Sequence, residues 1–133
     1  MKLIIDIGNS CTKLAVFNGD KIIDFITDEI VSIELLKSIF NKYPQIESSI
    51  LSSVAKHDPG LVEFLSQIGF FIELNHSTKV PFTNNYSTPN TLGKDRIAIA
   101  AAAFQMYPNK NVLVIDTGTS KTYDLVLSSG EYV

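Results

Sequence analysis

Two short segments of the sequence place an aspartate after an apolar run and follow it with glycine and small polar residues. The first segment covers residues 6–10 (DIGNS) and the second covers residues 116–120 (DTGTS). Glycine lets the backbone come close to a ligand, and successive N–H groups of a turn can face a phosphate. Because a carboxylate repels phosphate, we expect Asp6 and Asp116 to hold a cation or to orient its water ligands. Two such turns would clamp a polyphosphate together with its metal ion.

Side chains next to these turns add groups that bind phosphate. Ser10, Thr12, Thr119 and Ser120 carry hydroxyl donors, and Lys13 adds a compact positive charge that can reach a phosphate oxygen. Either turn taken alone also fits an Asp-Gly hairpin without a ligand, but the lysine and the repetition of the pattern favour phosphate binding. The sequence contains neither G-x-x-x-x-G-K-[ST] nor G-x-G-x-x-G, so P-loop and dinucleotide-binding folds lose support.

A third candidate site lies at residues 92–96 (LGKDR), where a polar loop meets an expected helix. Asp95 falls in the first helical turn, where the helix dipole favours a negative charge. Arg96 beside it can bind a carboxylate through two parallel hydrogen bonds. An enzyme that phosphorylates a hydroxyl group needs a carboxylate to accept the hydroxyl proton, and Asp95 is the candidate. Taken alone, Asp95 also fits a simple helix start and Arg96 a solvated surface charge.

The two acidic segments belong to a longer internal repeat. Residues 3–17 align with residues 113–127 at a constant offset of 110, and seven of the fifteen positions are identical. About one identity would be expected by chance at ordinary residue usage. The identical pairs are Leu3/Leu113, Ile5/Ile115, Asp6/Asp116, Gly8/Gly118, Ser10/Ser120, Thr12/Thr122 and Val16/Val126. The repeat predicts a duplicated architecture, and we expect the chain to end before the second copy is complete.

The pattern of apolar residues predicts an α/β fold in the order βββ-α-β-α-β-α-ββ. The expected strands cover residues 2–5, 12–17, 21–26, 49–52, 70–74, 111–115 and 122–127. The expected helices cover residues 32–43, 59–67 and 94–106, and the last is rich in alanine, so it can approach a neighbouring surface closely. Residues 75–91 form a long polar loop with two prolines, which we do not expect to pack as part of the core.

Composition and charge restrict the function classes. The 133 residues are 45% hydrophobic and 19% charged, which is typical of a globular domain, and a net charge of −3 argues against broad nucleic-acid binding. Cys11 is the only cysteine, so no intrachain disulfide can form, and we expect a reduced, cytoplasmic setting. The acidic Asp6 comes too early for a signal peptide, and no apolar run approaches the roughly 18 residues of a membrane span. We expect neither a nucleic-acid nor a membrane partner.

Three motifs, in this order along the chain, resemble those of type III pantothenate kinases. Residues 6–13 (DIGNSCTK) resemble the first phosphate motif of that family, D-x-G-N-[ST]-x-x-K. Residues 86–96 (YSTPNTLGKDR) resemble its pantothenate motif, Y-x-x-P-x-x-L-G-x-D-R, and residues 116–119 (DTGT) its second phosphate motif, D-x-G-T. The resemblance implies a ribonuclease H-like, actin-type ATPase fold with a mixed sheet. Residues 1–109 would form the first domain, and residues 110–133 the first strands of a duplicated second domain.

The resemblance also implies an activity, namely the ATP-dependent phosphorylation of pantothenate to 4'-phosphopantothenate, the first step toward coenzyme A. Asp95 would accept the proton, and the pantothenate-binding residues would be Tyr86, Gly93, Lys94, Asp95 and Arg96, with Arg96 suited to the substrate carboxylate. The residues that contact ATP would be Asp6, Ile7, Gly8, Asn9, Ser10, Cys11, Thr12, Lys13 and Thr119. Asp6 would also hold Mg²⁺, directly or through water, and Asp116 would bind K⁺ or NH₄⁺. A homodimer with substrate sites at the subunit interface is implied as well.

Two features depart from the family pattern. The family usually has Ala-x-Thr after the second D-x-G-T, whereas Lys121 here follows a serine and brings a charge close to the phosphate motif. Family members are also about twice as long, so we expect this polypeptide alone to have little or no kinase activity. The alternative function is that of a non-catalytic accessory or regulatory relative, although the intact charged motif residues favour the enzyme. A kinase for a sugar or an acetate-like acid is disfavoured by residues 86–96.

Overall fold

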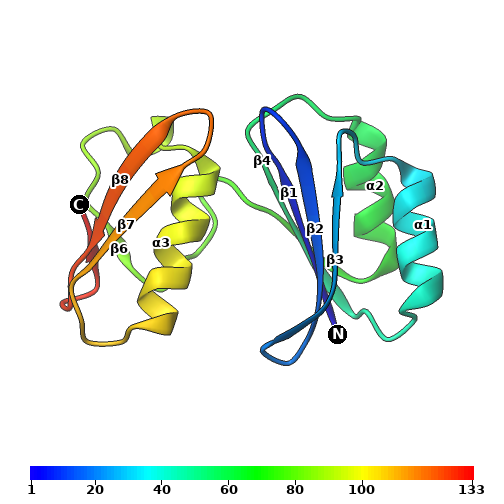
Figure 1. Ribbon diagram of the computed structural model, residues 1–133, viewed down its shortest axis with the longest axis horizontal. Helices are drawn as coiled ribbons and strands as arrows, with labels where there is room; N and C mark the ends of the chain where they lie inside the picture. The colour runs from blue at the N-terminus through cyan, green and yellow to red at the C-terminus, as the bar shows by residue number, and fades with distance from the viewer. The chain divides into compact units, whose positions relative to one another are not determined.

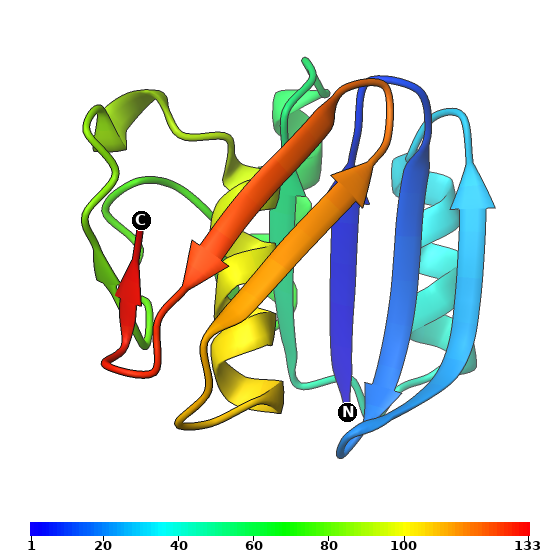
Figure 2. The same cartoon turned by 60° about the vertical axis from the view of Figure 1, so that its left-hand side comes forward.

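The chain divides into two compact units in the computed structural model, which describes residues 1–133. The first unit covers Met1–Leu74 and the second covers Asn75–Val133. Each unit has its own sheet and its own helical layer (Figures 1 and 2). This division by packing assigns the alanine-rich helix to the second unit. The boundary between duplicated domains, which the repeat places between residues 109 and 110, stays a prediction.

The first unit is a five-stranded mixed sheet with two helices on one face (Figure 1). Its elements are β1 (Lys2–Ile7), β2 (Thr12–Asn18), β3 (Lys21–Asp28), α1 (Ile33–Lys42), β4 (Ser48–Ser53), α2 (Pro59–Ile68) and β5 (Phe70–Glu73). The strand order is β3-β2-β1-β4-β5, in which β1 pairs antiparallel with β2 and parallel with β4. The predicted βββαβα pattern with a mixed sheet is therefore confirmed.

Side-chain caps start both helices of the first unit where the sequence predicts. The Ser32 hydroxyl accepts a hydrogen bond from the Leu35 N–H at 3.1 Å at the start of α1. The Asp58 carboxylate accepts one from the Gly60 N–H at 2.8 Å at the start of α2, and Pro59 occupies the first helical position. These caps satisfy N–H groups that the helix itself leaves without a partner, which explains why each helix begins at that residue.

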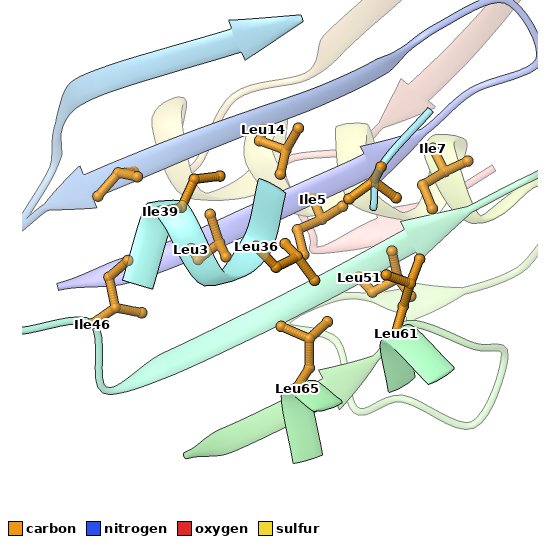
Figure 3. Close-up of a cluster of buried hydrophobic side chains, with 12 residues drawn as sticks. Leu3, Ile5, Ile7, Leu14, Leu36, Ile39, Ile46, Leu51, Leu61 and Leu65 are labelled. Atoms are coloured by element: carbon orange, nitrogen blue, oxygen red, sulfur yellow. The ribbon is translucent and has the colours of Figure 1, made fainter. Parts of the chain in front are cut away.

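The core of the first unit lies between the sheet and its two helices, as Figure 3 shows. Alternate residues of β1 and β2 point into it, and α1 and α2 contribute one apolar stripe each. Its buried members include Leu3, Ile5, Ile7, Leu14, Val16, Leu36, Ile39, Leu51, Leu61 and Leu65. One face of β1 is therefore committed to packing, and only its other face is available to carry polar groups.

The second unit is a four-stranded sheet with one long helix. Its elements are β6 (Thr83–Asn84), the 3-10 turn η1 (Pro89–Thr91), α3 (Lys94–Met106), β7 (Val112–Thr117), β8 (Lys121–Val126) and β9 (Glu131–Tyr132). The strand order is β6-β9-β8-β7, and β7 pairs antiparallel with β8. Helix α3 packs against β7 and β8 through the small or apolar side chains of Ile97, Ala100 and Ala103, as its alanine content predicts (Figure 2).

The long loop packs more closely than the sequence predicts. Phe82 is only 8% exposed, and β6, inside the loop, pairs in parallel with β9. The Thr83 N–H donates to the Gly130 carbonyl at 2.8 Å, and the Asn85 N–H donates to the Tyr132 carbonyl at 2.9 Å. The expectation that no part of residues 75–91 packs as core is therefore wrong at Phe82. The reason is that backbone hydrogen bonds to a later strand hold this segment, and a local sequence pattern does not reveal them.

Both units are α/β, and both sheets are mixed. In the second unit β6 and β9 run parallel, whereas β9 runs antiparallel to β8. This agrees with the predicted α/β class and with an actin-type ATPase fold. None of the helices combines the length and the apolar character that crossing a membrane requires.

Candidate active site

The first acidic segment sits at the end of the β1–β2 hairpin. Asp6 in β1 lies directly opposite Lys13 in β2, so their side chains share one face of the sheet. This face is opposite to the one that carries Leu3 and Ile5 into the core. Lys13 is exposed and Asp6 is partly exposed. The hairpin thus presents one carboxylate and one ammonium group side by side, outside the apolar core.

The turn of this hairpin covers residues 8–11. The Gly8 N–H donates to the Cys11 carbonyl at 3.0 Å, which closes the turn. A Cβ atom at position 8 would lie 3.1 Å from that same carbonyl oxygen, so a larger residue would have to push the turn open. Asn9 and Ser10 at the tip are exposed, and Cys11 is partly exposed. A tight turn with an exposed polar tip fits the predicted approach of the backbone to a phosphate.

Two residues of the first motif, Ile7 and Thr12, point their side chains toward the core and not toward the face of Asp6 and Lys13. Ile7 and Thr12 lie opposite each other at the end of the β1–β2 ladder, and both are buried on the core face. Their side chains are therefore on the face of the sheet away from Asp6 and Lys13. The predicted contact of Ile7 with ATP can involve only its backbone. The predicted contact of the Thr12 hydroxyl stays a prediction that this burial disfavours.

The second acidic segment sits at the end of the β7–β8 hairpin. Asp116 in β7 lies opposite Thr122 in β8 and is partly exposed. Its face of the hairpin is the one that carries Val114 and Asp124. The turn covers residues 118–120, and Thr119 within it is exposed. Both acidic segments therefore end a β-strand at an exposed turn, as the repeat predicts.

The two hairpins differ in register by one residue. In the first, four residues separate the strands and Leu3 lies opposite Val16. In the second, three residues separate the strands, and Leu113 lies opposite Leu125 where the repeat would place Val126. Since successive side chains alternate between faces, this one-residue difference turns the whole of β8 over relative to β7.

Arg96 and Asp124 form an ion pair in the second unit, with the carboxylate fully buried. The Arg96 Nε donates to Asp124 Oδ1 at 2.8 Å, and Arg96 Nη2 lies 2.6 Å from the same oxygen. The Asp124 side chain is 0% exposed and that of Arg96 is 22% exposed. The Tyr132 hydroxyl donates to Asp124 Oδ1 at 2.5 Å, and the Thr122 hydroxyl lies 3.4 Å from Oδ2. A buried carboxylate is thus neutralised by a cation and supplied with further donors.

Aromatic rings surround this pair. The Arg96 guanidinium carbon lies 5.1 Å from the centre of the Tyr86 ring, which is within cation–π distance. The Tyr132 ring lies 6.3 Å from the Tyr86 ring and 5.8 Å from the Phe82 ring, centre to centre. The first and last residues of the 86–96 motif therefore meet each other, and the rings shield the ion pair from water.

The ionisation of this cluster follows from its contacts. The hydrogen bond to Asp124 raises the pKa of the Arg96 guanidinium above its ordinary value, so Arg96 carries its charge at every relevant pH. Burial, and then the hydrogen bond to Asp124, raises the pKa of the Tyr132 phenol. Tyr132 therefore stays protonated and serves as a donor to the carboxylate.

Asp95 lies in the first turn of α3, next to Arg96. Its Oδ1 atom accepts a hydrogen bond from the Arg96 backbone N–H at 2.9 Å, and the side chain is partly exposed. A Cβ atom at Gly93 would clash with the same Oδ1 atom, so glycine leaves the space that this carboxylate occupies. Lys94, the first residue of the helix, is partly exposed. The helix start thus holds one carboxylate in a defined position beside the Arg96 cluster.

A comparison with family models shows which family the chain belongs to. The model of the type III pantothenate kinase family matches residues 2–133. The chain belongs to the type III pantothenate kinase family.

Alignments with individual members of the family support this assignment. The chain is 42% identical over 136 residues to a type III pantothenate kinase of Christiangramia forsetii, an alignment that covers 100% of this chain and 55% of the relative. It is 41% identical to the type III pantothenate kinase of Phocaeicola vulgatus, with 99% of this chain and 54% of the relative covered. The enzyme of that name from Aquifex aeolicus is 35% identical over 128 residues, 94% of this chain and 50% of the relative. The chain spans about half the length of the curated relatives it matches.

Membership in the type III pantothenate kinase family accounts for the three motifs, which the structure distributes over both units. The first phosphate motif ends the β1–β2 hairpin of the first unit. The pantothenate motif and the second phosphate motif lie in the second unit, at the start of α3 and at the end of β7. The predicted roles of their residues stay predictions.

A kinase family implies ATP with a divalent metal ion, and the carboxylates of these motifs are chemically suited to such an ion. The structure has no group of three or more His, Cys, Asp or Glu side chains that could hold a metal ion by itself. Mg²⁺ in kinase sites is bound by one or two carboxylates, by phosphate oxygens and by several waters. A single carboxylate beside a phosphate-binding turn, such as Asp6, matches that donor set.

Sequence reasoning missed Asp124, which holds the pantothenate-motif arginine. Its signal in the sequence is a charged residue inside the apolar strand pattern of residues 122–127, at the position where the first repeat has Leu14. Sequence reasoning assigned Arg96 to the substrate carboxylate, and the structure shows that Arg96 already binds a carboxylate of the protein. The two assignments are compatible only if the guanidinium binds both carboxylates through different edges.

Proposed function

We propose that this chain carries the pantothenate- and phosphate-binding residues of an enzyme that phosphorylates pantothenate at the expense of ATP, as the first step of coenzyme A biosynthesis. The observation that carries the proposal is the family match over residues 2–133. The contact between Tyr86 and Arg96, the first and last residues of the 86–96 motif, supports it. A binding module without this activity would not need the charged residues of all three motifs.

In this proposal Asp95 accepts the proton of the pantothenate hydroxyl and orients the oxygen for attack on the γ-phosphate. Its position at the helix start and the space left by Gly93 support this role. Tyr86, Lys94 and Arg96 bind pantothenate, and Arg96 pairs with its carboxylate. The attack forms a new oxygen–phosphorus bond, breaks the bond to the β-phosphate oxygen and leaves ADP.

The same proposal assigns the ATP and ion sites. Residues 6–13 and Thr119 bind the phosphates of ATP, which acts together with Mg²⁺. Asp6 holds the Mg²⁺ ion directly or through a water ligand, and its place opposite Lys13 supports a joint role in phosphate binding. Asp116 binds K⁺ or NH₄⁺. These ions supply positive charge that offsets the charge of the transferring phosphoryl group.

The proposal extends to assembly and location. The enzyme acts as a cytoplasmic homodimer, with substrate sites at the subunit interface. Because the chain spans about half of its relatives, we expect it to bind ligands weakly and to show little turnover alone.

A ligand-binding and turnover experiment tests the proposed function. Thermal denaturation is measured with ATP and Mg²⁺, with pantothenate, with both, and with glucose as a control substrate, because a ligand that binds only the folded state raises the melting temperature. ADP release is measured in parallel, in K⁺ and in Na⁺ buffers. We expect stabilisation by ATP and pantothenate, none by glucose, and loss of any turnover in the Asp95→Asn variant. Stabilisation by glucose and not by pantothenate would contradict the proposal.

A further inference from the structure

We propose that Asp124 is a positioning residue for Arg96. It holds the guanidinium by its Nε/Nη2 edge and thereby turns the remaining N–H groups toward the carboxylate of the substrate. This inference rests on the proposed function, because it assumes that Arg96 binds pantothenate. Asp124 lies outside all three motifs and is not assigned any role by them.

The geometry supports a holding role because Asp124 uses only part of the guanidinium. Arginine has five N–H donors in a rigid plane, and the contacts to Asp124 Oδ1 engage one on Nε and one on Nη2. Three donors remain on Nη1 and Nη2; a hydrogen bond with the Tyr86 side chain engages part of this set, and the others lie at the Nη1/Nη2 end, which can bind a carboxylate in parallel hydrogen bonds. One arginine can therefore hold two carboxylates, one on each edge.

Three further contacts restrict the rotation of this arginine. The Tyr86 ring stacks on the guanidinium at 5.1 Å, and the Tyr132 hydroxyl donates to the oxygen of Asp124 that Arg96 binds. The Arg96 backbone is fixed by its N–H bond to Asp95. Since Asp124 is fully buried in β8, the carboxylate itself has little freedom to move. A bound substrate would thus meet a side chain whose direction is set before binding, which lowers the entropy lost on binding.

The net charge of the Arg96–Asp124 pair explains why the orientation of the guanidinium matters more for binding than its long-range attraction for the substrate. Arg96 and Asp124 together carry no net charge, so the pair exerts only a weak long-range pull on an anion. The affinity for a carboxylate must then come from short, well-aligned hydrogen bonds. Such bonds discriminate pantothenate from panthenol, in which a hydroxymethyl group replaces the carboxylate.

The test compares Asp124→Asn with a matched control, Asp24→Asn. Asp24 in the first unit accepts from Lys42 Nζ at 2.9 Å and from the Tyr43 hydroxyl at 2.8 Å, so it has the same kinds of partner but lies outside the unit that carries residues 86–96. Isothermal titration calorimetry gives the affinities for pantothenate and panthenol in the presence of a non-hydrolysable ATP analogue and Mg²⁺. We expect the wild-type chain and Asp24→Asn to bind pantothenate about 10- to 100-fold more tightly than panthenol, because a hydrogen bond to a charged group contributes a factor of about this size to affinity. Asp124→Asn should lose most of this preference.

A second readout does not depend on any ligand. The Nε–H resonance of Arg96 in a ¹⁵N-correlated NMR spectrum should exchange slowly with water in the wild-type chain, because Asp124 accepts this proton in a buried site. Asp124→Asn should broaden or shift this resonance, whereas Asp24→Asn should leave it unchanged. If Asp124→Asn does not fold, Tyr132→Phe removes one hydrogen bond of the same carboxylate, and we expect it to reduce the preference by a smaller factor.

The outcomes separate this inference from the proposed function. A wild-type chain that binds neither compound contradicts the proposed binding of pantothenate by this chain, and with it the substrate role of Arg96. Binding with a preference for pantothenate that survives in a folded Asp124→Asn variant overturns the positioning role alone. An unchanged Arg96 Nε–H resonance in that variant, or an unchanged preference in Tyr132→Phe where Asp124→Asn cannot be obtained, overturns it as well.

Discussion

The β1–β2 hairpin of the first unit and the β7–β8 hairpin of the second share a strand–turn–strand sequence but use its two faces differently. Leu3 and Ile5 are 0% and 1% exposed, whereas their counterparts Leu113 and Ile115 are 60% and 54% exposed. Strand β1 turns this apolar face to α1 and α2, whereas β7 turns its opposite face to α3, and β2 and β8 turn the same repeat positions inward (Figures 1 and 2). Identical residues at repeated positions can therefore be core in one unit and surface in the other.

A single repeat position makes the contrast sharpest. Leu14 of the first repeat is a buried core residue, and its counterpart Asp124 is a buried carboxylate paired with Arg96. Both positions face the helical layer of their own unit, where Asp124 meets Arg96 at the start of α3, and the shorter turn instead changes which residues of β7 share that face. Apolar packing supports the first hairpin, and an ion pair inside an aromatic shell supports the second. The comparison shows that one inward position of a duplicated strand can serve apolar packing in one unit and an ion pair in the other.

Removal of the buried carboxylate should have the largest effect. Asp124→Ala leaves the Arg96 charge in a partly buried site without its partner, and breaking one side of such a pair costs about 3–5 kcal/mol. The second unit should therefore unfold at lower urea concentration, while the first unit is unaffected. Residue-specific amide signals in NMR spectra recorded along a urea titration would follow each unit separately. Equal stability of the second unit in the wild type and the variant would show that the pair does not support this hairpin.

Truncation of matched leucines should have a smaller and unequal effect. Leu3→Ala creates a cavity in the core of the first unit and should cost about 2–5 kcal/mol. Leu113→Ala removes an exposed side chain and should change the free energy of unfolding by no more than about 0.5 kcal/mol. Chemical denaturation of both variants measures the difference directly. Similar losses in the two variants would mean that the exposed face of the second hairpin is covered in solution.

Local patterns predicted the regular elements well. Strands β1, β2, β7 and β8 and all three long helices lie within a few residues of their predicted positions, because apolar periodicity and caps specify them locally. The two-residue strands β6 and β9 were not predicted. They are too short to show a period, and hydrogen bonds between residues 83–85 and 130–132 hold them together. The burial of Phe82 follows from this non-local pairing and was missed for the same reason.

In the candidate site, too, sequence could predict one part and not another. The motif residues Tyr86, Asp95 and Arg96 could be chosen from sequence, because their spacing resembles a family pattern. The contact from Arg96 to Asp124 spans 28 positions and depends on which face of β8 meets α3. The repeat alignment places Asp124 at the inward position of Leu14, but it does not show that α3 brings Arg96 to that position. Sequence could thus name the arginine but not its partner.

Alkaline pH should weaken the second unit through Tyr132. Its pKa is raised in the folded state by burial and by Asp124, whereas an unfolded tyrosine titrates near 10. Its stabilising contribution is therefore complete below about pH 10 and is lost as the pH rises toward the folded pKa. Urea titrations between about pH 9 and 11 should show declining stability of the second unit, and Tyr132→Phe should reduce this decline. A decline of the same steepness in Tyr132→Phe would assign it to other groups.

Acidic pH should slightly weaken the first unit through Asp24. The hydrogen bond from Lys42, followed by that from Tyr43, lowers the pKa of Asp24, which in an unfolded chain is about 3.9. Its contribution to stability is present above that value and is lost as the pH falls through the lower folded pKa. Because this pair is solvent-exposed, its effect should be the smallest of the four and should shrink with added salt. Stability of the first unit measured between about pH 5 and 2.5 in wild type and Asp24→Asn would test this, and two curves of identical shape would contradict it.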